Sequence, residues 1–565
     1  MPLDDRHKRL IKDADRLFKN RASLESLWQE SAENFYPERA DFTTTRSLGT
    51  DFAANLVTSF PILARRALGD ALSALLRPVN LDTTSPGGWF SIGVQEPMMA
   101  ANNGNRKWLE WATGVQRRAM YDRVSQFTRA TKEGDHDFSA FGQAVLTIEL
   151  NRHRNALLYR CHHLRDVAWM ENAEREIDFV VRKWKPTVQQ LVQTYGEKAH
   201  TKVRELLKDD PYKEIECRHI VIFAENYERR GVDGKRFRLP WVQILIDADN
   251  EHLVEEVESA SRIYLIPRWQ TVSGSQYAYS PSVVAALPDA RLIQAMTLSL
   301  LEASQKYGNP PMVATREVIR SDINLYEGGI TWVDAEYDER LGEALRPVYK
   351  PSAASGMTPG MNMAGEVRSM IQQAFFLDSL SLPPADVRDM TAFEVGQRIS
   401  EWIRRATPIF EPVEFEYNGQ LCEMTFDLLI QNGVFGTVEE MPQSLRGAEL
   451  EFKFESPLHE AADRRKGQKL MESRALLEQI IPLDPGAATM LDPREALRDA
   501  LNGVGVPAKW LRDAAAMEEM DKARQEAQQI QGAAQGAAAA ATIAKDLGSA
   551  AQGFASAKAV EQTPA

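Results

Sequence analysis

Apolar residues recur at helical spacing in two long stretches near the middle of the chain. The first begins after Pro281 and continues to about residue 307, and the second covers residues 361–376. The segment between them opens at Asn309, Pro310 and Pro311 and loses the helical period. At ~1.5 Å per residue, the two helices would span roughly 40 Å and roughly 24 Å. The pattern therefore predicts a helical stalk with a small module at its tip.

Helical periods also dominate the N-terminal part of the chain. Residues 4–37 are predicted to form one long helix or two joined helices, and residues 51–76 a further helical run. A short strand is predicted at 89–94, followed by helices over 105–128 and 132–142.

The pattern changes to short runs of β-branched and aromatic residues from residue 143 onwards. Strands are predicted at 144–150, 156–161, 178–184, 220–223 and 241–246, with a helical patch at 187–207. Residues 377–389, which include Pro383 and Pro384, are predicted to form a loop. Helical spacing returns over 391–431, where Pro408 and Pro412 require a bend or break. A strand at 448–454, helices over 457–529 and an Ala-rich tail complete an α+β, mainly helical fold.

Composition is that of a soluble globular chain, with 565 residues, 44% apolar and 26% charged. The charged N-terminus lacks a signal-peptide core, and no run approaches the ~18 consecutive apolar residues of a membrane-spanning helix. We therefore expect neither secretion nor membrane insertion. Three cysteines, Cys161, Cys217 and Cys422, are too few for a disulfide framework and indicate a reducing compartment.

The formal net charge is −13. Proteins that grip nucleic acid usually carry a basic surface, because phosphate neutralisation dominates their affinity. The chain therefore either does not meet nucleic acid or meets it without holding it.

Motifs for catalysis or metal binding are incomplete. His459 and Glu460 begin a zinc-protease pattern that lacks its second histidine. The spacing of a second set of possible ligands fits no zinc pattern: Cys161, His162, His163, Cys217 and His219. Pairs of carboxylates do not identify an active site, because the chain has 80 acidic residues and such pairs are common in it. We expect no catalytic, metal or cofactor site and no enzymatic activity.

Four basic residues lie around the stalk, its tip and the loop that follows: Arg346, Lys350, Arg368 and Arg388. Such residues most often form a solvated face. The functional alternative is a set of sparse contacts to a phosphate backbone.

Several short motifs in a fixed order resemble one known family. They are Leu287-Pro288-Asp289, then Asn309-Pro310-Pro311, then Met390-Thr391-Ala392-Phe393-Glu394-Val395 with Arg398, then Glu455-Ser456-Pro457-Leu458, and Gly505-Val506-Pro507. The chain resembles the portal, or head-to-tail connector, proteins of T7-like short-tailed bacteriophages over roughly residues 10–529. The tail after Gly532 lies outside this resemblance.

The resemblance implies the phage portal fold, with wing, stem, clip and crown regions, assembled as a ring of twelve copies around a channel. The regions would be 1–265 (N-terminal part of the wing), 266–307 (first stem helix and its lead-in), 308–358 (clip), 359–376 (second stem helix), 377–389 (tunnel loop, with Asp378, Ser379, Ser381, Pro383 and Pro384), 390–455 (remaining wing), 456–529 (crown) and 530–565 (tail, as a barrel extension or disorder).

The implied function is a conduit at one capsid vertex for packaging and ejecting double-stranded DNA. Its partners would be other copies of itself, the terminase large subunit, tail adaptor and nozzle proteins, major capsid and scaffolding proteins, and internal core or ejection proteins. The virion protein would be made in the host bacterial cytoplasm. An acidic bore would repel phosphates and let DNA slide without sequence preference. Two alternatives stay open: another phage structural or scaffold protein, and a hydrolase with a diffuse acidic site.

Overall fold

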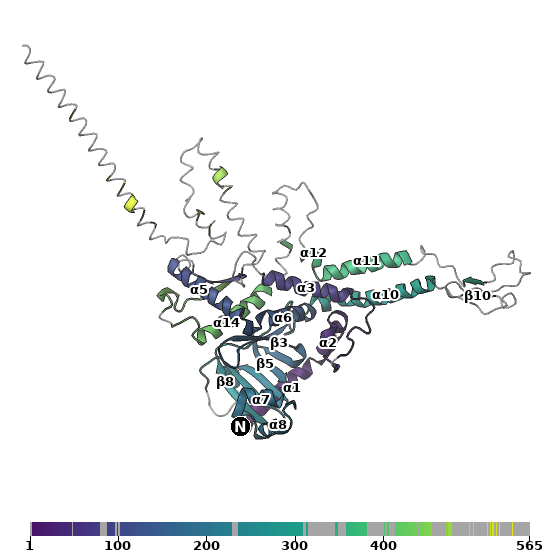
Figure 1. Ribbon diagram of the computed structural model, residues 1–565, viewed down its shortest axis with the longest axis horizontal. Coiled ribbons are helices and arrows are strands. Elements are labelled where there is room, and N and C mark those ends of the chain that lie inside the picture. The colour runs from purple at the N-terminus through teal and green to yellow at the C-terminus, as the bar shows by residue number, and fades with distance from the viewer. Residues whose placement is uncertain are drawn as a thin grey trace, which may run out of the picture. The chain divides into compact units, whose positions relative to one another are not determined.

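The computed structural model of the chain (Figure 1) describes residues 3–47, 49–78, 88–96, 99, 102–228, 236–308, 312–314, 345–347, 357–380, 401, 404–405, 413–437, 440–454 and scattered residues between 471 and 545.

The principal helices in chain order are α1 (Asp5–Asn20), α2 (Ala22–Phe35), α3 (Phe60–Leu76), α5 (Asn103–Met120), α6 (Phe127–Phe141), α7 (Val188–Tyr195), α8 (Thr201–Asp209), α9 (Ala224–Glu228), α10 (Leu287–Gly308), α11 (Met357–Ala374), α12 (Leu377–Leu380) and α14 (Gln420–Gln431). Two π-helical turns, η5 (Ser282–Ala286) and η8 (Glu414–Gly419), lead directly into α10 and α14. The 3₁₀ turns are η1 (Pro37–Arg39), η2 (Arg123–Ser125), η3 (Leu164–Asp166), η4 (Gly196–Lys198) and η9 (Gln443–Leu445).

The strands are β1 (Phe90–Val94), β2 (Val145–Leu150), β3 (Leu157–His162), β4 (Val167–Glu171), β5 (Ile177–Trp184), β6 (Cys217–Phe223), β7 (Trp241–Asp247), β8 (His252–Ser259), β9 (Tyr264–Leu265), β10 (Met312–Ala314), β11 (Leu345–Pro347) and β12 (Leu450–Phe454). They form a five-stranded sheet β4-β5-β6-β7-β8, a three-stranded sheet β3-β2-β9, and the pairs β1-β12 and β10-β11.

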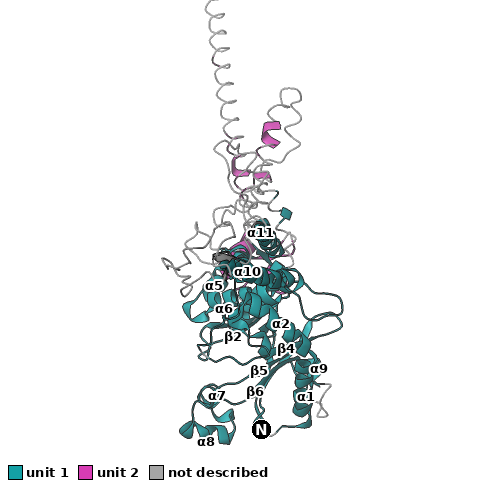
Figure 2. Ribbon diagram, turned by 90° about the vertical axis from the view of Figure 1, so that its right-hand side faces the viewer, with its two compact units in different colours: residues 1–91, 113–436, 452–462 teal, residues 92–112, 437–451, 463–565 magenta. Residues whose placement is uncertain are grey.

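The chain divides into two compact units, coloured in Figure 2. Unit 1 comprises residues 1–91, 113–436 and 452–462 and contains both larger sheets and the stalk helices. Unit 2 comprises residues 92–112, 437–451 and 463–565. Within unit 2, Ser444 Oγ lies 2.7 Å from Asn105 Oδ1, which ties the η9 segment to the first turn of α5.

The five-stranded sheet has all neighbouring strands antiparallel and is covered on both faces. Leu10, Ala14 and Phe18 of α1 pack on one face, and Trp28 belongs to the core on the other. Six consecutive residues at the start of β5 are buried, because a central strand between two cores has no solvent-facing side.

The outer edge of β4 is closed by side chains. Arg21, at the junction of α1 and α2, donates to the carbonyls of Val167 and Arg165, and Gln276 Nε2 donates to the Trp169 carbonyl (2.9 Å). An exposed edge strand offers unpaired carbonyls to other chains. These contacts therefore protect the edge and join the first two helices to the sheet.

Helix α6 lies at the centre of unit 1, where ten of its residues are buried. The last carbonyls of a helix have no partner inside the helix. Here Ser280 Oγ donates to the Ala140 carbonyl (2.8 Å), Ser282 Oγ donates to the Ser139 carbonyl (3.2 Å), and the Gly142 N–H donates to the Phe138 carbonyl (2.8 Å). The chain that leads into the stalk thus caps α6.

Most predicted elements that lie within the described residues are confirmed, and residues 4–37 form two joined helices rather than one. Of the predicted helical run 391–431, only residues 401, 404–405 and 413–431 are described, and the predicted helices over 457–529 and the Ala-rich tail lie almost entirely outside the described residues. The prediction of helix over 51–76 is wrong for residues 51–59, which form turns before α3. The N–H groups of Val57 and Thr58 donate to Gln294 Oε1, at 2.8 and 2.9 Å, instead of to helical carbonyls. The predicted loop at 377–389 begins with the short helix α12.

Five strands, β4, β8, β9, β10 and β11, were not predicted. Strand β8 carries Glu255, Glu256 and Glu258, and most of its side chains are partly exposed because it is an edge strand. It therefore lacks the apolar run by which strands are recognised. Strands β4 and β9 are short, with five and two residues.

One described helix, Ser282–Lys306, is long and apolar enough to cross a membrane by length and composition alone. Charged residues interrupt this helix, so it is not an unbroken run of ~18 apolar residues. Asp289 and Arg291 lie within it, and 22% of its apolar window is buried in the chain's own core.

Two histidines are enclosed beside Arg182, between the three-stranded and five-stranded sheets. His219 Nδ1 lies 2.6 Å from the Tyr264 hydroxyl, and His162 Nε2 lies 3.0 Å from both Thr147 Oγ1 and Arg182 Nη1. Burial, reinforced by the Arg182 charge, lowers the pKa of His219 to about 3 and holds that of His162 well below its usual range. Both imidazoles are therefore neutral in the folded chain.

We predict that His219→Asn makes stability less dependent on pH between about pH 6.5 and 4. In this range the unfolded wild type takes up a proton at His219 and the folded chain does not, so stability falls as pH falls. The wild type should lose at most ~1.4 kcal/mol per pH unit more than the variant. Urea unfolding at pH 7, 6, 5 and 4 measures this. His153→Asn, at the exposed turn after β2, is the control, and equal slopes in all three proteins would contradict the assignment.

We predict that Gly142→Ala destabilises the fold far more than Gly274→Ala. Both glycines have positive φ, +76° and +89°, so alanine strains the backbone at both positions. Only at Gly142 would the new Cβ meet backbone, at 2.5 Å from the Tyr279 carbonyl carbon, whereas nothing lies within 4 Å at Gly274. Thermal unfolding should show a loss of about 1 kcal/mol for Gly274→Ala and a several-fold larger loss for Gly142→Ala. Equal losses of stability in the two variants would contradict the prediction, because they would mean that the backbone between α6 and the stalk shifts to accommodate the new Cβ.

Candidate functional site

The candidate site is the pair of helices α10 and α11, which lie side by side in unit 1 (Figure 1). They run antiparallel: the end of α11 contacts η5, and its first turn at Gly360 lies against Leu300 of α10. A Cβ on Gly360 would lie 2.9 Å from the Leu300 side chain, so glycine permits this close approach. Beyond α10, Met312 pairs with Pro347, and this antiparallel β10–β11 pair belongs to the predicted tip.

A stripe of small and branched residues forms the seam between the two helices. Fully or almost fully buried side chains occur on α10 and its π-turn at Ala286, Ala290 and Ile293, and on α11 at Ala364, Val367 and Ile371. Their spacing of three to four residues places each set on one helix face.

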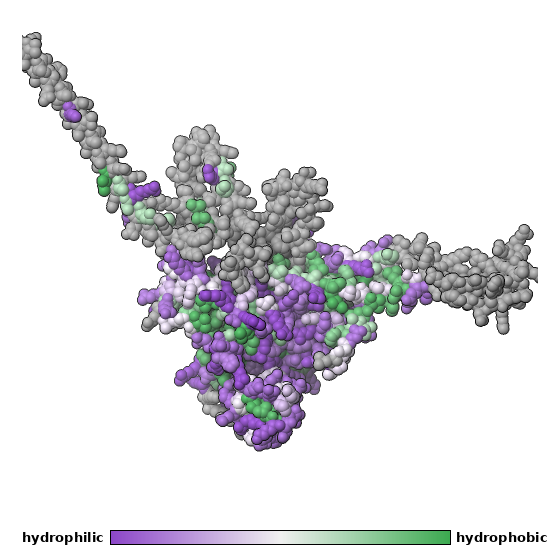
Figure 3. Space-filling model, in the orientation of Figure 1, coloured by the Kyte–Doolittle hydropathy of each residue, from purple (hydrophilic) through white to green (hydrophobic). Residues whose placement is uncertain are grey.

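Large apolar side chains are also exposed on both helices, outside the seam. They are Val284 (62% exposed), Leu292 (37%), Leu298 (45%) and Leu301 (50%) on the first, and Met361 (62%), Met363 (50%) and Met370 (44%) on the second. Figure 3 shows the resulting apolar surface over α10 and α11. A surface of this kind marks a place where another molecule binds.

Polar contacts fix α10 to the rest of unit 1. Gln294 accepts from Val57 and Thr58 and donates through Nε2 to the Thr58 carbonyl (3.0 Å). Arg291 Nε lies 2.7 Å from Glu30 Oε1 of α2. Sequence reasoning missed Gln294, whose only signal is a polar residue within a largely apolar helix.

Pro288 accounts for the π-turn at the root of α10. Proline has no N–H to donate to the carbonyl four residues earlier, at Val284, and its ring clashes with that carbonyl in a regular helix. The wider turn of η5 ends at Ala286, just before Pro288, and provides the room. Pro288 and Asp289 thus lie where the sequence motif placed them, in the first turn of α10.

Aromatic contacts hold the end of α11. The Phe375 ring meets Phe35 of α2 edge-on at 5.4 Å between centroids, and Phe376 stacks on Trp269 at 6.3 Å. Phe376 has φ +57°, a left-handed conformation that is unfavourable for a bulky side chain. No sequence signal indicates this conformation.

Only some of the predicted site residues lie within the described part of the chain. Arg368 is exposed on α11, with its guanidinium carbon 6.0 Å from the centre of the Phe60 ring. Arg346 lies in β11, paired with Val313. Asp378 and Ser379 lie in α12. The remaining predicted residues lie outside the described residues: Lys350, Arg388, Ser381, Pro383, Pro384, Pro310, Pro311, Thr391, Ala392, Glu394 and Val395.

The metal hypothesis finds no support among the described residues, where no group of three or more His, Cys, Asp or Glu side chains could hold an ion. Cys161 Sγ lies 3.7 Å from Asp137 Oδ2, and burial, with the Asp137 charge, raises the pKa of the thiol well above its usual range. Arg39 binds both Asp137 oxygens at 3.1 Å. Cys161 is therefore a protonated thiol beside a structural ion pair.

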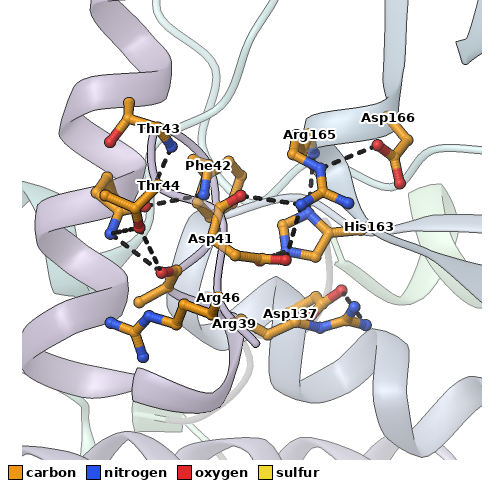
Figure 4. Close-up of polar contacts among 12 residues, drawn as sticks. Arg39, Asp41, Phe42, Thr43, Thr44, Arg46, Asp137, His163, Arg165 and Asp166 are labelled. Carbon is orange, nitrogen blue, oxygen red and sulfur yellow. Dashed lines mark hydrogen bonds and ion pairs between the residues drawn. The ribbon is translucent and has the colours of Figure 1, made fainter. Parts of the chain in front are cut away.

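A polar cluster surrounds His163 (Figure 4). His163 Nε2 lies 2.7 Å from Asp41 Oδ1, and its Nδ1 accepts from the Arg165 N–H at 3.0 Å. Burial raises the pKa of Asp41, but His163 and Arg165 outweigh burial and lower it overall. His163 Nε2 joins the 40–44 segment to η3 and His163 Nδ1 caps η3, so both nitrogens have a structural role.

Comparison with known proteins identifies the family of the chain. A family model described as "Bacteriophage head to tail connecting protein" matches residues 7–511. The chain is 23% identical over 500 residues to a "Portal protein" of Salmonella phage epsilon15, covering 87% of this chain and 86% of the relative. It is 24% identical over 462 residues to a "Probable portal protein" of Bordetella phage BPP-1, covering 80% and 79%. The chain therefore belongs to the bacteriophage head to tail connecting protein family.

Proposed function

We propose that this chain is the portal protein of a short-tailed phage and forms a ring of twelve copies at one vertex of the capsid. Double-stranded DNA would pass through the ring during packaging and ejection. The family assignment and the names of the relatives support the general role. The ring, its number of copies and its partners are our proposal.

The exposed apolar surface of α10 and α11 is the observation that best supports the assembly of a ring. Leu292 and Leu298 lie six residues apart on α10, which separates them by ~120° around the helix axis, one on each side of the seam. Met361 and Met363 on α11 lie two residues apart, which separates them by ~160° around the helix axis. Apolar side chains therefore flank the seam on both sides, as a ring subunit with a neighbour on each side requires.

Burial supplies the free energy for assembly. Covering a Leu or Met side chain contributes ~1.5–3 kcal/mol relative to leaving it exposed. One patch on each flank favours a head-to-tail contact between identical copies, which closes into a ring when the rotation fits.

The same proposal gives roles to the other regions. The stem would be α10 with residues 266–307 and α11 with residues 359–376, and residues 308–358 would form the clip that docks the terminase large subunit and then the tail adaptor and nozzle proteins. Residues 1–265 and 390–455 would form the wing, 377–389 the tunnel loop, 456–529 the crown and 530–565 a tail. The wing and crown would meet major capsid, scaffolding and internal core or ejection proteins.

A net charge of −13 per copy suits a channel that DNA passes through without being held. Arg346, Lys350, Arg368 and Arg388 would supply the few contacts to the phosphate backbone. The terminase would supply the energy for translocation, and the ring would act as conduit and docking site.

We predict that Leu298→Glu combined with Met363→Glu prevents ring assembly. The two carboxylates would have to be desolvated in the interface between copies, which costs several kcal/mol per interface. Native mass spectrometry should show monomers for the variant and a closed ring for the wild type. Val272→Glu replaces a loop residue of similar exposure (56%) and should leave the ring intact. A variant ring of normal size would contradict the role of the stalk surface.

We predict that the assembled ring binds duplex DNA weakly, without sequence preference, and less tightly as salt rises. Replacing Arg346, Lys350, Arg368 and Arg388 with alanine should weaken binding and reduce the slope of log K against log salt by ~0.9 for each phosphate that is no longer neutralised. Fluorescence anisotropy with two unrelated duplexes of about three helical turns, at several salt concentrations, measures both the affinity and the slope. Unchanged slopes would assign these residues to the solvated surface.

A further inference from the structure

The outward face of α1 carries a stripe of exposed cations. The stripe consists of Arg9, Lys12, Arg16 and Lys19. Steps of three, four and three residues keep these side chains within ~80° around the helix axis and spread them over ~15 Å of its length. They lie opposite the face of α1 that packs on the five-stranded sheet.

The cations of the stripe have no acidic partners within the described part of the chain. None of the four forms an ion pair there, and Asp15, which lies beside them, pairs with Arg218 at 3.7 Å instead. Asp5 and Asp13 lie on or next to the same face, so cations still outnumber carboxylates. Like charges three or four residues apart on a helix repel one another. The stripe is therefore a local positive surface, on a chain of net charge −13, that a negative partner would stabilise.

A pocket of about 610 Å³ adjoins the stripe. Its lining includes Arg16 and Leu17 of α1, residues 274–277, and the apolar side chains of Leu24 and Phe179. Its volume falls within the ~300–1,000 Å³ that is usual for binding pockets. Because Arg16 belongs both to the stripe and to the pocket lining, one partner can contact both.

The two features together favour an acidic protein segment over nucleic acid. Duplex DNA carries negative charge along its whole length, so a duplex on the ~15 Å stripe would continue over the surface of an acidic chain. A phosphate backbone also has no apolar group to place against Leu17 and Phe179. A short protein segment needs only a few carboxylates for the stripe and one large apolar side chain for the pocket.

We propose that the stripe and the adjoining pocket bind an acidic segment of another protein that carries a large apolar anchor residue. The carboxylates of the segment lie along the stripe, and the anchor enters the pocket beside Arg16. About five residues of extended chain cover the ~15 Å of the stripe. Figure 2 shows α1 and the α10–α11 pair in different parts of unit 1. The inference therefore goes beyond the proposed conduit, and either can fail while the other stands.

Binding of a labelled peptide to the full-length protein, in the oligomeric state in which it purifies, tests the proposal. The probe is fluorescein-labelled Trp-Glu-Glu-Glu-Glu-Trp, which places an anchor at each end of the acidic run. Fluorescence anisotropy should show about tenfold tighter binding of this peptide than of two controls, one with Ala for Trp and one with Gln for Glu. Affinity should also fall as salt rises, because the stripe is exposed. Equal affinity for the probe and either control would overturn the proposal.

Charge-reversal variants locate the binding surface. Lys12→Glu combined with Lys19→Glu should weaken binding of the probe about tenfold, because like charges then face each other. Arg204→Glu combined with Lys208→Glu changes the net charge equally on exposed positions of α8 and should leave binding unchanged. Equal weakening in both variants would contradict a site on α1.

Duplex DNA of about two helical turns distinguishes the other class of partner. Tighter binding of the duplex than of the probe, lost in the Lys12→Glu, Lys19→Glu variant, would assign the stripe to nucleic acid and overturn the proposal. Circular dichroism and thermal unfolding check that each variant folds. If the α1 variant does not fold, the three peptides on the wild-type protein decide the proposal alone.

Discussion

The capping of α6 by the chain that leads into the stalk is the constraint on which the rest of unit 1 depends. The C-terminal carbonyls of this buried helix cannot reach water and must find donors inside the protein. The Ser280 and Ser282 hydroxyls provide them, and Gly142 lets the two backbones approach. The direction in which the first stalk helix leaves the body is therefore set by the hydrogen-bonding needs of a helix about 140 residues earlier in the chain.

The other π-turn, η8, packs against a second side of α6. Tyr417 of η8 packs on Phe138 at 5.9 Å between ring centres, and Asn418 accepts from Arg77 (2.9 Å) and donates to the Leu76 carbonyl (2.9 Å). Arg77 also pairs with Asp135 of α6. One buried helix thus joins α3, the stalk and the segment before α14, so that residues far apart in sequence form one body.

Sequence periodicity predicted those elements whose burial is one-sided or complete, such as α10, α11 and β5. It failed where partners from distant parts of the chain decide the structure. Residues 51–59 have an apolar pattern typical of a helix, but Gln294 binds their N–H groups and holds turns instead. The left-handed Phe376 depends on its aromatic partner Trp269, which no local pattern reveals. The family resemblance supplied the proposed function, because a surface through which copies of a chain would assemble has no catalytic motif by which it could be recognised.

The central claim, that the exposed apolar flanks of α10 and α11 bring identical copies together in a ring, is tested most directly by electron microscopy of the purified protein. Class averages viewed along the symmetry axis should show a closed ring of twelve lobes around a hole wide enough for a DNA duplex. Isolated particles of the size of one 63.5 kDa chain under all assembly conditions, with no ring, would contradict the account.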